Sequence, residues 1–144
     1  MAVCVWAIEE FNKALQTGCQ YEKLQNETAE RLWTMLAFYA PIATNLLALR
    51  ALAHHDSERP ASEVLSPEEI AILEANRPTR GKNAQAPMTV KYALATIARM
   101  GGHFTSNGEP GWIVLLRGAV ELHQQVRGWR MAMQHAARAS DAPD

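Results

Sequence analysis

Apolar residues recur every three or four positions through most of the chain, which is the spacing that places side chains on one face of an α-helix. No stretch alternates apolar and polar residues in the manner of a half-buried strand, so the pattern predicts a mainly α fold. A first helix is predicted at about residues 4–17, followed by Gly18 as a typical helix end. Its stripe is formed by Cys4, Ile8, Phe11 and Leu15.

A second and longer helix is predicted from Asn26, which is a suitable N-cap residue. Pro41 lies inside it, and an internal proline removes a backbone donor and crowds the preceding turn, so we expect a kink or a division there. The apolar face of this helix consists of Leu32, Met35, Leu36, Tyr39, Leu46, Leu49 and Leu52.

Two shorter helices have clear start and stop signals. Residues 66–69 read Ser-Pro-Glu-Glu, which supplies an N-cap, a proline at the first helical position and a glutamate three residues later. This helix should end near Asn76. The next helix is predicted from Thr89 to Met100, because a pair of glycines follows at residues 101–102.

The last helix is predicted from about residue 112 to about His135, with apolar residues at alternating intervals of three and four. That spacing is typical of a helix that packs along another helix, either within the chain or in a dimer. Its two tryptophans favour an interface, where aromatic residues are common. The candidate dimerisation stripe is Trp112, Leu115, Ala119, Leu122, Val126, Trp129 and Met133.

Composition limits the class of protein. With 144 residues and 48% hydrophobic content, the chain can bury the core of one domain. Two cysteines without paired spacing indicate a reducing compartment, so we expect a cytoplasmic protein. The N-terminus lacks a basic leader, and no apolar run approaches 18 residues free of polar groups. We therefore expect neither secretion nor a membrane span.

Charge is distributed unevenly along the chain. Residues 1–76 contain 11 acids against five Lys or Arg, whereas residues 77–144 contain four acids against nine. No acid occurs between Glu74 and Glu109, so this stretch could neutralise phosphates, although a solvated basic loop explains it equally well. Its cations are Arg77, Arg80, Lys82, Lys91 and Arg99.

Glu9 and Glu10 form a carboxylate pair on the first predicted helix. A carboxylate fixed on a helix can bind Mg²⁺, but a single protein ligand would hold this ion weakly. The structural alternative is an ion pair of Glu9 with Lys13, one helical turn later.

Residues 6–19 read Trp-Ala-Ile-Glu-Glu-Phe-Asn-Lys-Ala-Leu-Gln-Thr-Gly-Cys, which resembles the last catalytic motif of the insertion-sequence-four family of DDE transposases. The family's motif places the third metal-binding carboxylate at its first glutamate, and the match puts that role on Glu9. Residues 97–103, 108–112 and 116–118 resemble the family's C-terminal dimerisation region. Together the resemblance covers nearly the whole chain.

The resemblance implies two parts: residues 1–25 as a remnant of an RNase H-like catalytic domain, and residues 26–144 as a helical dimerisation domain. Of the motif's basic positions only Lys13 keeps its charge, since the family's arginine, histidine and second lysine fall on Val5, Asn12 and Gln16. The candidate DNA-binding residues are therefore Lys13 from the motif and Arg77, Arg80 and Lys82 from the basic stretch.

The implied function is cut-and-paste DNA transposition at transposon ends with Mg²⁺ as cofactor. In the family, two aspartates from upstream strands complete the metal site with this glutamate. We therefore expect the chain to be a truncated transposase, inactive alone, that forms a homodimer or pairs with a full-length transposase. Two alternatives are a helical interaction module or decayed gene product, and a basic DNA-binding module centred on residues 77–99. The first helix should be mobile or drive association, unless it folds back on the rest.

Overall fold

Every named element of the protein is helical, in a computed structural model that describes residues 2–18, 28–78, 86–104, 106 and 108–140. Within these residues no strand forms, and the only β-type pairing is an isolated bridge between Pro60 and Thr89. The predicted mainly α class is therefore confirmed. The elements are α1 (Ala2–Lys13) with a π-helical turn η1 (Ala14–Gly18), α2 (Ala29–His55), a 3-10 turn η3 (Ala61–Glu63), α3 (Pro67–Ala75), α4 (Val90–Met100) and α5 (Trp112–Ser140).

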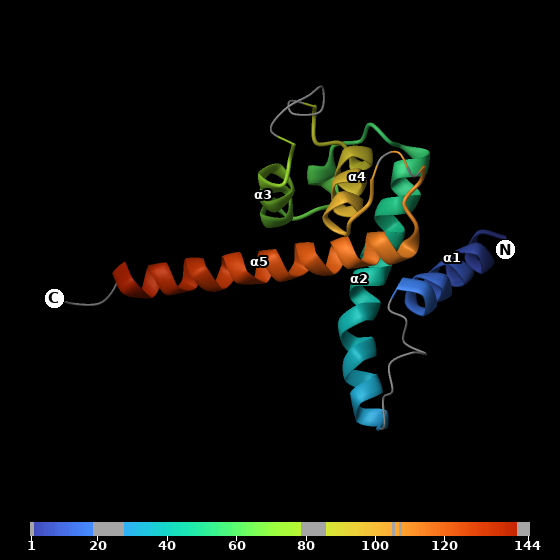
Figure 1. Ribbon diagram of the computed structural model, residues 1–144, viewed down its shortest axis with the longest axis horizontal. Coiled ribbons are helices and arrows are strands. Elements are labelled where there is room, and N and C mark those ends of the chain that lie inside the picture. Colours follow the sequence, from blue (N-terminus) through green and yellow to red (C-terminus); the bar gives the residue numbers. More distant parts are fainter. Residues whose placement is uncertain (1, 19–27, 79–85, 105, 107, 141–144) are drawn as a thin grey trace.

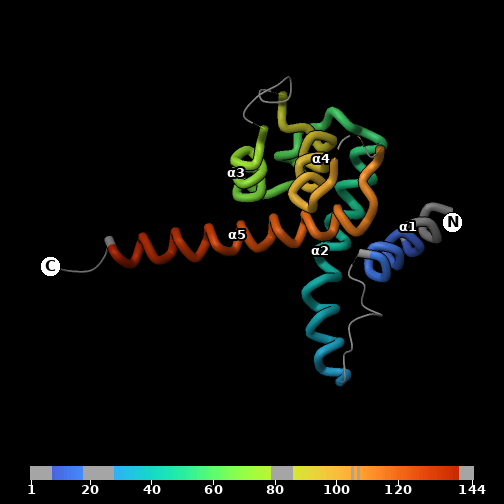
Figure 2. Tube along the Cα trace, viewed as in Figure 1, coloured from blue at the N-terminus to red at the C-terminus, as the bar shows by residue number. Residues whose placement is uncertain are grey.

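The longest helix, α5, runs across the molecule and extends beyond it (Figure 1). On one side of α5 lie α3, α4 and the last turns of α2, whereas the first turns of α2 protrude on the other side. The tube in Figure 2 shows α1 beside the start of α5, although the two are about a hundred residues apart in sequence. The contacts of α5 with η1, α2, α3 and α4 make it the common support of the fold.

Helix starts follow the capping signals in the sequence, with one displacement. The hydroxyl of Ser66 accepts a hydrogen bond from the Glu69 amide, and the Glu69 carboxylate accepts one from the Ser66 amide at 2.8 Å, so the predicted capping box is confirmed. Thr89 caps α4 as predicted. The N-cap of α2 is Thr28, whereas Asn26 lies outside the described residues. Thr28 is a good N-cap because its hydroxyl accepts a hydrogen bond from the backbone amide of Arg31 in the first turn.

Pro41 does not divide α2, which continues from Ala29 to His55. Packing holds the following turn in place, because Ile42, Ala43, Leu46 and Leu49 are buried in the core. This burial offsets the single backbone hydrogen bond that the proline removes.

By length and composition alone, α2 is long and apolar enough to cross a membrane. The uncharged stretch between Arg31 and Arg50 accounts for this, because its polar residues are neutral ones such as Thr and Asn. In the fold its second half is a core helix, while Leu32, Trp33 and Phe38 in its first half are exposed.

The crossing of α4 and α5 depends on two glycines that face each other. A Cβ atom at Gly118 would collide with the carbonyl oxygen of Ile97, and one at Gly101 would collide with that of Val114. The backbones therefore touch, and only glycine fits at either position. Gly102 serves a different purpose: its φ of 92° reverses the chain after α4.

The segment α1–η1 folds back on the rest of the chain. Ala14 is fully buried, and Phe11 and Leu15 pack against the core that α2, α4 and α5 build. Ile8 of α1 remains largely exposed, whereas the side chain of Trp6 lies outside the described residues. The predicted domain boundary at residue 25 also lies outside them.

Candidate functional site

Adjacent carboxylates on α1 have opposite environments. Glu9 is exposed to solvent, whereas the Glu10 side chain is only 15% exposed and faces the start of α5. Successive residues on a helix point about 100° apart, so a helix can bury one of two adjacent side chains and leave the other in solvent. Glu9, the residue that the resemblance assigns to metal binding, is thus available to a partner, and Glu10 is not.

Glu10 attaches α1 to α5. Its Oε2 accepts a hydrogen bond from the indole Nε1 of Trp112 at 3.0 Å, and its Oε1 pairs with Lys13 Nζ at 3.0 Å. The Lys13 ammonium, more than the Trp112 indole, holds the pKa of the Glu10 carboxyl below its ordinary value of 4.5, although burial opposes this shift. The ion pair between Glu9 and Lys13, which was the structural alternative, is wrong, because Lys13 pairs with Glu10 instead.

Arg50 completes this junction from the side of α2. Its guanidinium carbon lies 4.7 Å from the centroid of the Trp112 ring, which is within the range of a cation–π contact. Trp112 itself is only 8% exposed. Three helices therefore meet at one indole, which fixes where the solvent-facing Glu9 stands relative to the rest of the fold.

Magnesium is the cofactor that the resemblance implies, and the described residues do not by themselves assemble a site for it. They contain no group of three His, Cys, Asp or Glu side chains close enough to hold a metal ion. Glu10, the nearest carboxylate in sequence, is already bonded to Trp112 and Lys13. A hard divalent ion requires several oxygen ligands, so Glu9 could contribute only one of them.

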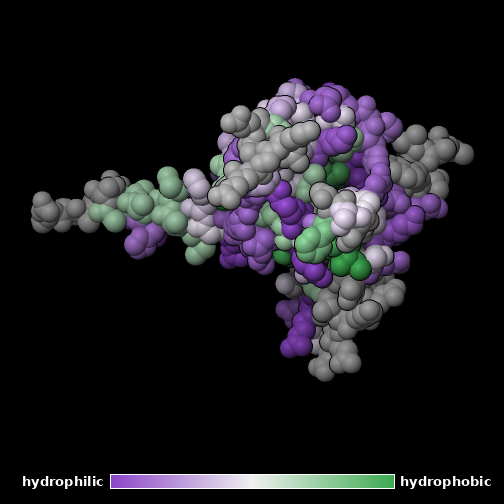
Figure 3. Space-filling view, turned by 45° about the horizontal axis from the view of Figure 1, so that its top comes forward, coloured by the Kyte–Doolittle hydropathy of each residue, from purple (hydrophilic) through white to green (hydrophobic). Residues whose placement is uncertain are grey.

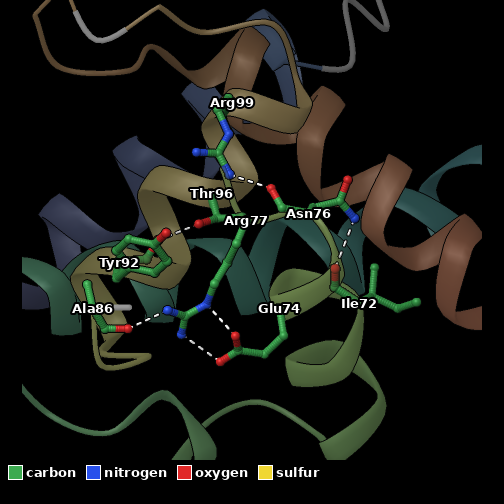
Figure 4. Close-up of polar contacts among 8 residues, drawn as sticks. All are labelled: Ile72, Glu74, Asn76, Arg77, Ala86, Tyr92, Thr96 and Arg99. Atoms are coloured by element: carbon green, nitrogen blue, oxygen red, sulfur yellow. Dashed lines mark hydrogen bonds and ion pairs between the residues drawn. The ribbon is translucent and has the colours of Figure 1, made fainter. Parts of the chain in front are cut away.

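Arg77, a predicted DNA-binding residue, is engaged within the fold (Figure 4). Its guanidinium pairs with Glu74, donates to the carbonyl oxygen of Ala86 and lies over the ring of Tyr92 at 4.9 Å. The side chain is only 13% exposed. Its contacts join the end of α3 to the start of α4, which leaves little of the charge for a phosphate.

The other predicted DNA-binding residues divide into two groups. Lys13 is 59% exposed, so its ammonium can still reach an anion although it pairs with Glu10. Arg80 and Lys82 lie outside the described residues. Sequence reasoning did not single out Arg99 as structural, but its guanidinium donates to the carbonyl oxygen of Asn76.

The predicted dimerisation stripe of α5 has two parts. Trp112, Leu115, Leu122 and Val126 are buried, and Ala119 packs against the same core, so this part of the stripe serves packing within the chain. The last two positions of the stripe do not pack within the chain. Trp129 is 46% exposed and Met133 is 59% exposed, because the rest of the fold ends before them.

Beyond Val126 the helix projects into solvent. Every residue in 127–139 is exposed, a length of about 20 Å at 1.5 Å per residue. In Figure 3 this arm carries pale green, apolar side chains beside purple ones. One ion pair, between Arg130 and Glu68 at 3.4 Å, ties its base to the first turn of α3.

Two features of the site were missed by sequence reasoning. The hydrogen bond between Glu10 and Trp112 joins residues 102 positions apart, and no local sequence pattern predicts it. The glycine contact between α4 and α5 could have been suspected, because Gly101 and Gly118 both lie in segments that carry the resemblance.

A search of the chain against models of known protein families gave no match.

Proposed function

We propose that this chain is the C-terminal association part of a DDE transposase, which presents the Glu9 helix at one end and the projecting arm of α5 at the other. The observation that supports the proposal most directly is the division of the α5 stripe. A heptad pattern that continues past Val126, the last buried position of the stripe, favours a helical partner for the exposed positions.

The positions of the resembling segments give a second line of support. Residues 97–103 and 116–118 resemble the dimerisation region of this transposase family, and both contribute to the close crossing of α4 and α5 through Gly101 and Gly118. Residues 108–112 include Trp112, which accommodates the helix that resembles the catalytic motif. The helix that resembles the catalytic motif and the segments that resemble the dimerisation region thus pack together, although they are far apart in the sequence.

The partner that we propose for the arm is a second copy of this chain, or the same region of a related transposase. Both would offer the same exposed stripe, and a symmetric pairing needs only one self-complementary surface. Strand transfer with Mg²⁺ would require carboxylates beyond Glu9, and we propose that another segment or chain supplies them.

The runner-up function is a helical interaction module without a role in transposition. Its support is that the described residues give Glu9 no companion ligands. The two functions differ in one measurable property. Only the transposase function predicts nicking or joining of transposon-end DNA with Mg²⁺ when this chain is combined with the missing carboxylates.

Association can be tested with two methionines that match in chemistry and exposure. Met133 lies on the stripe and Met131 lies off it, and they are 59% and 61% exposed. We expect Met133→Glu to raise the dimer dissociation constant about tenfold or more, equivalent to about 1.4 kcal/mol, while Met131→Glu leaves it unchanged. Sedimentation equilibrium measures both. A wild-type chain that stays monomeric at tens of micromolar, or equal effects of the two variants, would contradict association through the stripe.

A further inference from the structure

We propose that the cleft between α2, α4 and the loop before α5 binds a nucleoside phosphate, either as a free nucleotide or as the end unit of a nucleic-acid strand. The cleft has a volume of about 570 Å³, within the range of small-molecule sites. The cleft does not include the projecting arm, and of the residues at the α1 junction it shares Arg50.

Basic side chains gather on three sides of this cleft. Arg50 and His54 reach it from successive turns of α2, Lys91 and Arg99 reach it from α4, and His103 closes it from the loop, held by a contact of 3.1 Å between its Nε2 and the Gly108 carbonyl oxygen. Because the whole chain has a formal charge of −1, this concentration of positive groups is local. A phosphate is the anion that such a group of donors binds best.

Among the described residues no salt bridge joins the lysine or arginines of the cleft to a carboxylate, although Arg50 interacts electrostatically with Glu10. The arginines Arg59, Arg77 and Arg130 form ion pairs with acids, but Arg50, Lys91 and Arg99 form none. Glu109 is the one carboxylate that lines the described part of the cleft, at its loop end. The phosphate should therefore lie toward α4, and Glu109 can accept a hydrogen bond from a sugar hydroxyl or a base amine.

Apolar groups provide the surface for the nucleoside. Tyr92, Leu94, Pro110 and Leu115 line the same cleft, although Leu115 is fully buried and the Arg77 guanidinium lies over the Tyr92 ring. A base can pack against Leu94 and Pro110 while its phosphate reaches the basic side chains. Inorganic phosphate would use only the second of these contributions.

Titration calorimetry at low ionic strength tests the site with adenosine monophosphate, inorganic phosphate and a short single-stranded oligonucleotide. We expect saturable binding of the nucleotide, tighter than that of phosphate. Lys91→Glu should weaken it about tenfold or more, because Lys91 is exposed and its loss should leave the core intact. The matched control is Arg127→Glu on the α5 arm, outside the cleft, which should bind as the wild type does.

The ligands also distinguish the two sources. An oligonucleotide that binds at least as tightly as the mononucleotide supports a strand end, and one that does not bind supports a free nucleotide. No saturable binding, binding no tighter than inorganic phosphate, or equal weakening by Lys91→Glu and Arg127→Glu would each overturn the proposal. None of these outcomes depends on whether α5 associates.

Discussion

Glu9 and Glu10 have the same chemistry and different neighbours. The exposed Glu9 has solvent around it, whereas Glu10 holds both the Trp112 indole and the Lys13 ammonium. Hydrogen bonds to a charged group stabilise more than neutral ones, and their loss leaves the partner unsatisfied. Separate substitutions of the two residues therefore distinguish the attachment of α1 by Glu10 from the metal binding proposed for Glu9.

We expect Glu10→Gln to lower the free energy that holds α1 against the rest of the fold by about 1 kcal/mol. Glu9→Gln should leave this free energy unchanged. Loosening should appear as roughly fivefold faster amide hydrogen exchange in residues 8–13, measured by mass spectrometry or NMR. Equal exchange in the two variants would show that apolar contacts of Phe11 and Ala14, and not the carboxylate, hold the helix.

Acid should have the same effect as the substitution. Because the pKa of Glu10 is lowered in the fold, its contribution is complete above its ordinary value of 4.5 and is lost as the pH falls through the lowered pKa. The indole N–H signal of Trp112 should follow this loss in an NMR titration from about pH 7 to about pH 3. In Glu10→Gln that signal should lose this titration step.

At the scale of elements, local sequence signals predicted most helix ends, but they did not predict the contacts between residues far apart in the sequence. The capping box at Ser66, the cap at Thr89 and the end of α4 at its glycines follow from neighbouring residues, because caps satisfy backbone groups within one turn. The continuity of α2 through Pro41 depends on burial against other helices. The Glu10–Trp112 bond likewise exists only once the chain has folded.

The glycine crossing gives the clearest prediction for an element. Gly118→Ala should destabilise the fold by about 3 kcal/mol, because its methyl group would meet backbone and not a flexible side chain. Gly128 lies in the same helix with open space around its Cβ position, so Gly128→Ala should stabilise by about 0.5–1 kcal/mol through helix propensity. Urea denaturation measures both, and a neutral Gly118→Ala would mean that α4 and α5 can separate.

For the whole molecule, several of the exposed large apolar residues lie on its two protruding helices. Trp33 is 70% exposed on the protruding half of α2, and Trp129 and Met133 lie on the arm of α5. The sequence predicted an apolar stripe along the last helix, but not where the core would stop covering it. That limit depends on the length of α3 and α4 and on how they pack across α5, which are properties of the assembled fold.

If the arm associates, stability should depend on protein concentration. Binding that requires the folded state raises the melting temperature as the concentration increases. We expect this rise in the wild type between about 5 and 200 µM, and its disappearance in Trp129→Glu. Circular dichroism melting curves suffice, and a melting temperature that is constant in the wild type would count against a second copy as the partner.

The continuity of α5 has a mechanical consequence. Its first residue, Trp112, holds the helix that carries Glu9, and its last turns reach solvent about 43 Å away at 1.5 Å per residue. A rod of this kind transmits orientation over its whole span, so a molecule gripped at the far tip would be set at a defined angle and distance from that carboxylate.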